Sequence, residues 1–260
     1  MNIQQCRIIC FSPTGGTAKI AAAIARGTEL SVVVSDLTLP SHEEEPTPTL
    51  RENEFVILAA PVYYGRVAKT AIERMASLQG AGNPALVLVT YGNRHYDDAL
   101  LELYTLAETA GFMPVAAAAF VAEHSFCTAE FPFATGRPDG ADLSAAEDFG
   151  RRLVLRLRGG AAKLPGVPGN VPYKPYPHMH RAPLCTEACS LCGTCMSLCP
   201  TNAIYMEEGR LRTDEQRCIV CQACVKGCPA GARVDTASGA SETRERLSTL
   251  IKERREPEIF

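Results

Sequence analysis

Short hydrophobic runs alternate with amphipathic segments through residues 1–160. The runs have the composition of buried strands and cover residues 7–11, 31–36, 55–60, 85–90 and 114–122. The amphipathic segments have helical spacing and cover residues 17–26, 69–78, 97–110 and 141–157. Strands that alternate with helices form parallel βαβ units, because a parallel connection needs a long crossover. The pattern therefore predicts an α/β fold with a doubly wound, five-stranded parallel sheet.

Three other segments complete the predicted organisation. Residues 39–53 are acidic and proline-rich, which favours an irregular crossover between the second and third strands. Residues 161–183 are rich in Gly and Pro and predict a linker, in which His178 and His180 pack between domains or bind a metal. Residues 239–260 carry a narrow apolar stripe among charges, which predicts a helical tail that packs on one domain. The remaining residues, 184–238, form a small cysteine-rich α+β domain.

The composition is that of a globular protein. Hydrophobic residues make up 46% of the 260 residues, and the formal net charge is -3 at pH 7, which argues against a nucleic-acid partner. Residues 1–5 lack the basic and apolar pattern of a leader, and the apolar stretch 115–122 is too short to span a bilayer. We expect a cytoplasmic protein without a membrane span.

Eight of the twelve cysteines lie in two runs of identical spacing. The runs are Cys189-x2-Cys192-x2-Cys195-x3-Cys199-Pro200 and Cys218-x2-Cys221-x2-Cys224-x3-Cys228-Pro229. This spacing is typical of bacterial proteins with two iron–sulfur clusters, in which the fourth cysteine of each run binds the other cluster. We predict two [4Fe-4S] clusters. Cluster one is held by Cys189, Cys192, Cys195 and Cys228, and cluster two by Cys218, Cys221, Cys224 and Cys199.

Other interpretations of the cysteines stay open from the sequence. Four cysteines can hold a structural zinc ion or form disulfides. The spacing Cys185-x3-Cys189-x2-Cys192 is that of radical-SAM enzymes. Neither interpretation explains two complete runs, and the chain after Cys192 is short for a radical-SAM barrel. With two clusters, Cys185 is a spare thiol beside cluster one, and we expect Cys6 and Cys10 to be small buried residues of the first strand.

The loop between the first predicted strand and helix reads Ser12-Pro13-Thr14-Gly15-Gly16-Thr17. Hydroxyls, glycines and the free amides of a helix start together make an anion cradle, which suits a phosphate monoester. The loop has neither the ending of a Walker loop nor the G-x-G-x-x-G pattern of dinucleotide sites. The alternative interpretation is an ordinary turn with a Ser or Thr helix cap.

This loop, with Ser12-x-Thr14-Gly15-x-Thr17 after the first strand, resembles the FMN phosphate loop of flavodoxins. The resemblance implies a 2-1-3-4-5 sheet with FMN beside its first and third strands. It also implies that the flavin ring lies between residues 61–66 and 91–96, with a tyrosine stacked on it and with Gly65 and Gly92 allowing close backbone approach. The implied FMN-binding residues are Ser12, Thr14, Gly15, Gly16, Thr17, Pro61, Val62, Tyr63, Tyr64, Gly65, Tyr91, Gly92, Asn93, Arg94 and Tyr96.

A flavodoxin-like domain followed by a two-cluster ferredoxin domain resembles the family of fused flavodoxin–ferredoxin proteins. Residues 91–94, 123–125 and 136–139 look like further marks of that family without an assigned role, and Cys127 has none either. The resemblance implies an electron-transfer protein that relays electrons between FMN, two [4Fe-4S] clusters and an external redox protein. One alternative is a flavin-dependent reductase of a small substrate, with Arg94, Tyr96 or His124 as proton donor or anchor. Another is a non-catalytic iron–sulfur module.

Overall fold

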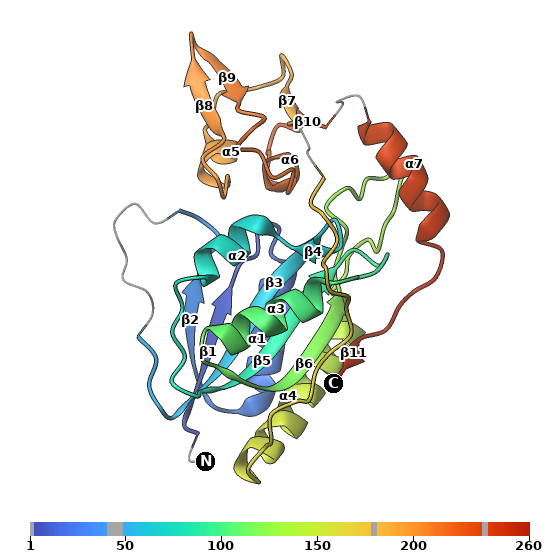
Figure 1. Ribbon diagram of the computed structural model, residues 1–260. Coiled ribbons are helices and arrows are strands. Elements are labelled where there is room, and N and C mark those ends of the chain that lie inside the picture. Colours follow the sequence, from blue (N-terminus) through green and yellow to red (C-terminus); the bar gives the residue numbers. More distant parts are fainter. Residues whose placement is uncertain (1–2, 41–48, 178–180, 236–238) are drawn as a thin grey trace.

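The computed structural model describes residues 3–40, 49–177, 181–235 and 239–260. It has an α/β unit built around one central sheet, and a smaller cysteine-rich unit beyond the carboxyl ends of the parallel strands (Figure 1). His178 and His180 fall outside the described residues, and so does most of the predicted irregular crossover. The described parts of that crossover, residues 39–40 and 49–53, contain neither helix nor strand.

The central sheet has seven strands in the described ranges, in the order β11-β6-β5-β3-β1-β2, with β4 paired to β3. They are β1 (Gln5–Cys10), β2 (Ser31–Asp36), β3 (Glu54–Tyr63), β4 (Arg66–Val67), β5 (Pro84–Tyr91), β6 (Met113–Val121) and β11 (Glu258–Ile259). The pairs β2–β1, β1–β3, β3–β5 and β5–β6 are all parallel. Without the two short strands, the order is the 2-1-3-4-5 of the flavodoxin-like fold. The predicted fold class is therefore confirmed.

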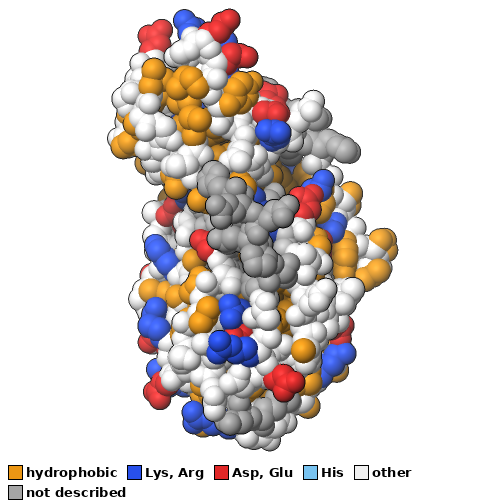
Figure 2. All heavy atoms as spheres, turned by 90° about the vertical axis from the view of Figure 1, so that its left-hand side faces the viewer, with side chains coloured by type: hydrophobic (Ala, Val, Ile, Leu, Met, Phe, Trp, Pro, Cys, Tyr) orange, Lys and Arg blue, Asp and Glu red, His pale blue; other side chains and the backbone are white. Residues whose placement is uncertain are grey.

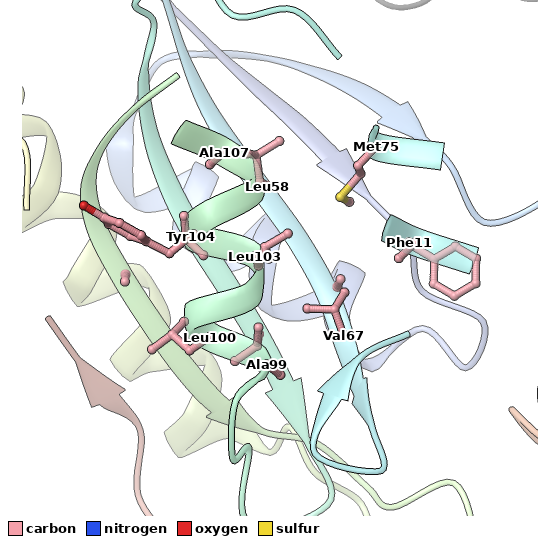
Figure 3. Packing of buried hydrophobic residues seen from close by; sticks show 14 of the residues in the cluster. Phe11, Leu58, Val67, Met75, Ala99, Leu100, Leu103, Tyr104 and Ala107 are labelled. Carbon is pink, nitrogen blue, oxygen red and sulfur yellow. The ribbon is translucent and has the colours of Figure 1, made fainter. Parts of the chain in front are cut away.

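Helices cover both faces of this sheet, as burial of a parallel sheet requires. One face carries α1 (Gly16–Thr28) and α4 (Gly140–Arg158), and the other carries α2 (Lys69–Met75) and α3 (Ala99–Thr109). Under α3, Leu100 and Leu103 pack with Leu58 of β3 and Met75 of α2 (Figure 3). The helices α1 and α4 lie so close that a Cβ atom on Gly27 would be 2.1 Å from the carbonyl oxygen of Glu147.

The cysteine-rich unit is small and, in its described residues, contains two short helices and four short strands. It comprises β7 (Leu184–Cys185), α5 (Thr194–Ser197), β8 (Ile204–Glu207), β9 (Arg210–Thr213), α6 (Ala223–Lys226) and β10 (Arg233–Val234). The strands β8 and β9 form a hairpin, and β10 pairs antiparallel with β7. Its small core consists largely of cysteine side chains together with Ala203, Ile204 and Leu211. Such a core buries little apolar surface, so we expect the folding stability of this unit to depend on the group that the cysteines bind.

The segment between the two units runs along α3. Asp98, at the start of α3, accepts hydrogen bonds from the backbone amides of Asn170 (3.0 Å) and Lys174 (2.8 Å). The hydroxyl of Tyr104 donates to the carbonyl of Leu164 (2.7 Å), and the hydroxyl of Tyr173 contacts Thr105 (3.1 Å). The segment is therefore attached to the α/β unit over most of its described length.

The C-terminal tail differs in part from the predicted helix over residues 239–260. The helix α7 (Ala240–Leu250) ends at Leu250, and the chain then extends to the short strand β11, which pairs antiparallel with β6. The edge of β6 offers unpaired backbone groups. The chain after α7 pairs with them as the strand β11 instead of continuing as a helix. Leu247 is buried, whereas Leu250 is 53% exposed.

Two further expectations concern burial and hydropathy. Cys6 and Cys10 are buried in β1 as predicted, and burial raises the pKa of both thiols to about 12. Within the described ranges, no helix combines the length and the apolar character that crossing a membrane demands.

Candidate functional site

The structure sorts the eight cysteines into two groups, each of which surrounds a small cavity. One cavity is lined by Cys189, Cys192, Cys195 and Cys228, and the other by Cys199, Cys218, Cys221 and Cys224. Cys199 and Cys228, the last cysteines of their runs, have thus exchanged partners. This is the crossed arrangement typical of two-cluster ferredoxins, and all twelve cysteines of the chain are free of disulfides.

Backbone amides donate to the cysteine sulfurs in the same way at both cavities. The amides of Leu191 and Val220 each lie 3.4 Å from the sulfur two residues earlier, on Cys189 and Cys218. Both donors have positive φ, 56° and 54°, which turns their amides toward the sulfur. Amide donors stabilise thiolate and tune the reduction potential of a bound cluster. The repeated geometry is a feature of cluster binding rather than of an ordinary turn.

The two groups differ in exposure. Burial raises the pKa of Cys218 to about 11 and that of Cys221 to about 12. Cys192 is exposed, and hydrogen bonds from the Thr194 hydroxyl and amide lower its pKa. Cluster two therefore occupies a desolvated site, and cluster one has an edge that faces solvent.

A cavity of about 350 Å³ lies at the carboxyl edge of the sheet, between the α/β unit, the cysteine-rich unit and α7. Its size is within the roughly 300–1,000 Å³ that is common for ligand sites. Loops after β1, β3, β5 and β6 converge there. Of the predicted FMN-binding residues, those that line it are Thr14, Gly16, Thr17, Pro61, Val62, Tyr63, Tyr64, Gly65, Tyr91, Gly92 and Arg94.

One end of the cavity is the start of α1. Gly15 holds the N-cap position at φ 81° and no side chain caps the helix. Among the described residues, the amides of Gly16 and Thr17 have no hydrogen-bond acceptor, so they are available to an anion. The hydroxyl of Thr17 is buried and pairs with the hydroxyl of Thr90 (2.6 Å). The free main-chain donors at this end of the cavity are thus the amides of Gly16 and Thr17.

The hydroxyl of Tyr91 is enclosed beside the C-terminal tail, where the charges of Glu258, Arg255 and Arg137 act on it. Tyr91 is 3% exposed, and its buried hydroxyl has no hydrogen-bond partner in the described part of the chain. Burial raises the pKa of this hydroxyl, so it remains a donor at neutral pH. An unpaired buried donor costs roughly 1–3 kcal/mol. Tyr91 therefore lines the cavity with atoms other than this enclosed hydroxyl.

Four of the predicted FMN-binding residues do not line the cavity: Ser12, Gly15, Asn93 and Tyr96. Ser12 braces the loop, since its hydroxyl accepts a hydrogen bond from the amide of Ala18 (3.1 Å). Tyr96 is 2% exposed, packs edge-on against Tyr91 and donates to Glu258 (2.7 Å). The side chains of Asn93 and Tyr96 face the C-terminal tail, so their assignment to FMN stays a prediction.

The structure shows a packing reason for the two loop glycines, Gly65 and Gly92. A Cβ atom on Gly92 would lie 2.1 Å from the ring of His124, and one on Gly65 would lie 2.3 Å from Asp97. Both positions therefore accommodate protein side chains that shape the cavity wall. The side chain of His124 lines the cavity, and its Nδ1 accepts the amide of Phe126 (3.1 Å). Burial, with Lys226 and Arg94 nearby, lowers the pKa of His124 to about 4.

Several cavity residues lie outside the loops that the resemblance to flavodoxins implies. They come from β5, the segment before the cysteine-rich unit, the loop of cluster two and α7, and they are Thr90, Lys174, Pro177, Ile219, Val220, Thr243, Arg246 and Leu247. Ile219 and Val220 lie directly between the cysteines Cys218 and Cys221. The cavity wall and the cluster-two site are therefore parts of one loop.

Three of the residues marked earlier without a role, Asn93, Arg137 and Asp139, hold the C-terminal tail. The side chain of Asn93 donates to the carbonyl of Glu253 (2.7 Å) and accepts the amide of Arg255 (3.0 Å). Arg137 donates to the carbonyl of Arg255 (2.8 Å), and Arg254 pairs with Asp139 (2.7 Å). These contacts fix the tail to the α/β unit and keep α7 over the cavity (Figure 1). Cys127 contacts Thr135 (3.3 Å) and does not line the cavity.

Comparison with known proteins gives one family match. Residues 188–232 match the 4Fe-4S dicluster domain. The chain is 44% identical over 50 residues to a tetrathionate reductase component of Archaeoglobus fulgidus, a stretch that is 18% of this chain and 24% of that protein. It is 48% identical over 40 residues to the thiosulfate reductase electron transfer protein PhsB of Salmonella typhi, which is 15% of this chain and 21% of that protein. The chain spans about a quarter of the length of the curated relatives it matches.

Among solved structures, an archaeal flavodoxin aligns with 60% of this chain and 99% of its own, at 17% identity and a TM-score of 0.39. A flavone reductase aligns with 96% of this chain and 93% of its own, at 11% identity and a TM-score of 0.43. The strand order establishes the flavodoxin-like fold, and the family match confirms the dicluster prediction. This chain joins a flavodoxin-like sheet to a 4Fe-4S dicluster domain.

Proposed function

We propose that the protein is an electron relay, in which the α/β unit binds FMN, the cysteine-rich unit binds two [4Fe-4S] clusters, and an external redox protein exchanges electrons with them. The observation that carries the proposal is that Ile219 and Val220 line the cavity while Cys218 and Cys221 flank them as ligands of cluster two. A flavin in the cavity therefore lies against the cluster-two loop. The domains assigned are residues 1–160 for FMN, 161–183 as linker, 184–238 for the clusters and 239–260 as tail.

The chain's own residues would hold FMN in three ways. The amides of Gly16 and Thr17 receive the phosphate at the start of α1. The hairpin residues Tyr63 and Tyr64 offer an aromatic wall, and Tyr91 adds to the lining of the same cavity. When bound, FMN supplies exchange of one or two electrons, and each cluster supplies exchange of one.

The order of the centres follows from burial. Cluster two is desolvated and adjoins the cavity, whereas cluster one has exposed Cys192 and, beside it, Leu191 at 48% exposure. Hydrophobic side chains gather on one face of the cysteine-rich unit, with charged side chains at its tip (Figure 2). A small apolar area with charged side chains nearby suits a transient redox contact, because such contacts bury little surface. We place the external partner at cluster one, and the sequence of centres as partner, cluster one, cluster two, FMN.

The tethering of the units supports transfer within one molecule. The segment before Pro177 is bound along α3, and α7 contacts the α/β unit and the cluster-two loop together. A fixed arrangement replaces a bimolecular encounter with a high effective concentration. Cysteine-bound clusters and free thiols suit a reducing compartment, so we place the protein in the cytoplasm.

The test is anaerobic purification of the full chain, followed by iron and flavin assays. We expect about eight irons and about one FMN per chain, and rapid reduction of the flavin after a reductant delivers electrons to the clusters. A chain that takes up iron but no flavin would be a non-catalytic iron–sulfur module. Saturable turnover of one small molecule by the pre-reduced protein would instead identify a flavin-dependent reductase.

A further inference from the structure

Arg233 of β10 is a buried cation with an unusual set of contacts. It is 2% exposed. Its Nη2 donates to the hydroxyl of Thr213 (2.7 Å) and to the carbonyl of Pro183 (2.9 Å), and lies 3.9 Å from the sulfur of Cys224. Its Nε is buried and has no hydrogen-bond partner among the described residues. The guanidinium is therefore held in place but is not fully satisfied by the protein.

The same side chain reaches both groups of cysteines. Arg233 lines the cavity of cluster one together with Cys195 and Cys228. Its contact with Cys224 belongs to cluster two. In the β7–β10 pair it lies opposite Cys185. One positive charge thus stands between the two sites.

No carboxylate of the described residues forms an ion pair with Arg233. Asp235, two residues later, instead pairs with Arg244 (3.8 Å) and accepts from Gln222 (2.8 Å). A buried charge without a counter-ion is strongly unfavourable. Thiolate-bound [4Fe-4S] clusters are anionic, so they would supply the negative charge that this guanidinium lacks.

We propose that Arg233 is a countercharge shared by the two clusters and that it raises the midpoint potential of both. The inference rests on the proposed function, because it requires both clusters to be bound. Reduction adds a negative charge to a site that is already anionic, and a buried cation nearby favours the reduced form. Neutralising Arg233 therefore lowers both potentials.

The experiment compares the full-length wild type with R233M, R233Q and R233K in anaerobic redox titrations monitored by spin resonance. R233M and R233Q should lower the equilibrium constant for one-electron reduction at least tenfold at each cluster, which corresponds to about 59 mV per tenfold change. R233K keeps the charge and should stay within about threefold of the wild type at each cluster. Arg212→Met is the matched control, because Arg212 of β9 is 52% exposed and pairs with Glu207 at the surface.

Several results would overturn the inference. They are unchanged potentials in iron-replete R233M and R233Q, a shift at one cluster alone, or an equal shift in R212M. If R233M and R233Q fail to assemble clusters while R233K assembles them, the charge itself is required and the inference holds. If R233K also fails to assemble them, Arg233 has a packing role and the inference fails. A wild-type chain without clusters would refute the proposed function instead, so the two failures are distinguishable.

Discussion

Val220 of the cluster-two loop and Leu247 of α7 pack in one buried apolar cluster, and both residues also line the large cavity. Phe126 and Phe133, from the segment after β6, complete that cluster. The α/β unit, the cysteine-rich unit and the tail therefore meet at a single apolar contact. Flavin affinity, cluster position and tail docking should respond together when this contact is weakened.

Leu247→Ala tests that contact. Truncation of a buried leucine costs about 2–5 kcal/mol, and at this place part of the loss should appear as weaker FMN binding. We expect at least a tenfold rise in the FMN dissociation constant, measured by quenching of flavin fluorescence, with a lowered melting temperature. Leu250→Ala is the control, because Leu250 is 53% exposed, and it should leave both quantities nearly unchanged. Equal effects of the two variants would argue against the apolar contact.

Thr14→Glu tests the phosphate cradle. Thr14 lines the cavity beside the free amides of α1, so a carboxylate there should repel the FMN phosphate and expel the cofactor. Riboflavin has the same ring without the phosphate and should bind the variant and the wild type with similar affinity. Flavin content after purification and the two affinities are the measurements. If T14E retained a full complement of FMN, the cradle would lie elsewhere.

Cys195→Ala tests the crossed assignment of cysteines. Cys195 lines the cluster-one cavity, and its loss should reduce iron from about eight to about four per chain, while FMN stays bound. Cys185→Ala is the matched control, because Cys185 lies beside the same site without lining its cavity, and it should keep the full iron content. Loss of flavin with intact iron in C195A would contradict the division of roles between the two units.

His124 predicts a pH dependence of stability. Burial lowers its pKa to about 4 in the folded chain, against about 6.5 in an unfolded one. Between these two pKa values the unfolded chain binds more protons than the folded chain does. The contribution of neutral His124 to the free energy of unfolding is therefore fully present above about pH 6.5 and is lost as the pH falls toward 4. His124→Asn should flatten the stability profile in that window, as followed by denaturant unfolding. Replacing the more exposed His95 by Gln should leave the slope as it is in the wild type.

The sequence alone determined the features that depend on local spacing. Alternation of apolar runs and helical segments predicted the doubly wound parallel sheet, because each element buries its own face, and the resemblance of the first loop to flavodoxins implied the strand order that the sheet has. The two cysteine runs specified which sulfurs share a cavity, because the spacing within a run dictates which side chains turn inward. The resemblance to flavodoxins implied Thr14, Tyr63 and Tyr91 as FMN-binding residues, and they line one cavity because the carboxyl ends of parallel strands share one edge.

Only the tertiary structure decided which segments pack against the carboxyl edge of the sheet. Asn93 and Tyr96 were assigned to the cofactor, yet they bind a tail whose partners, Glu253 and Glu258, are distant in sequence. Nor does any local pattern bring Val220 against Leu247, or Arg233 between two groups of cysteines. Such contacts depend on how separately folded surfaces dock, and docking is set by the shape and charge of whole faces rather than by the spacing of neighbouring residues.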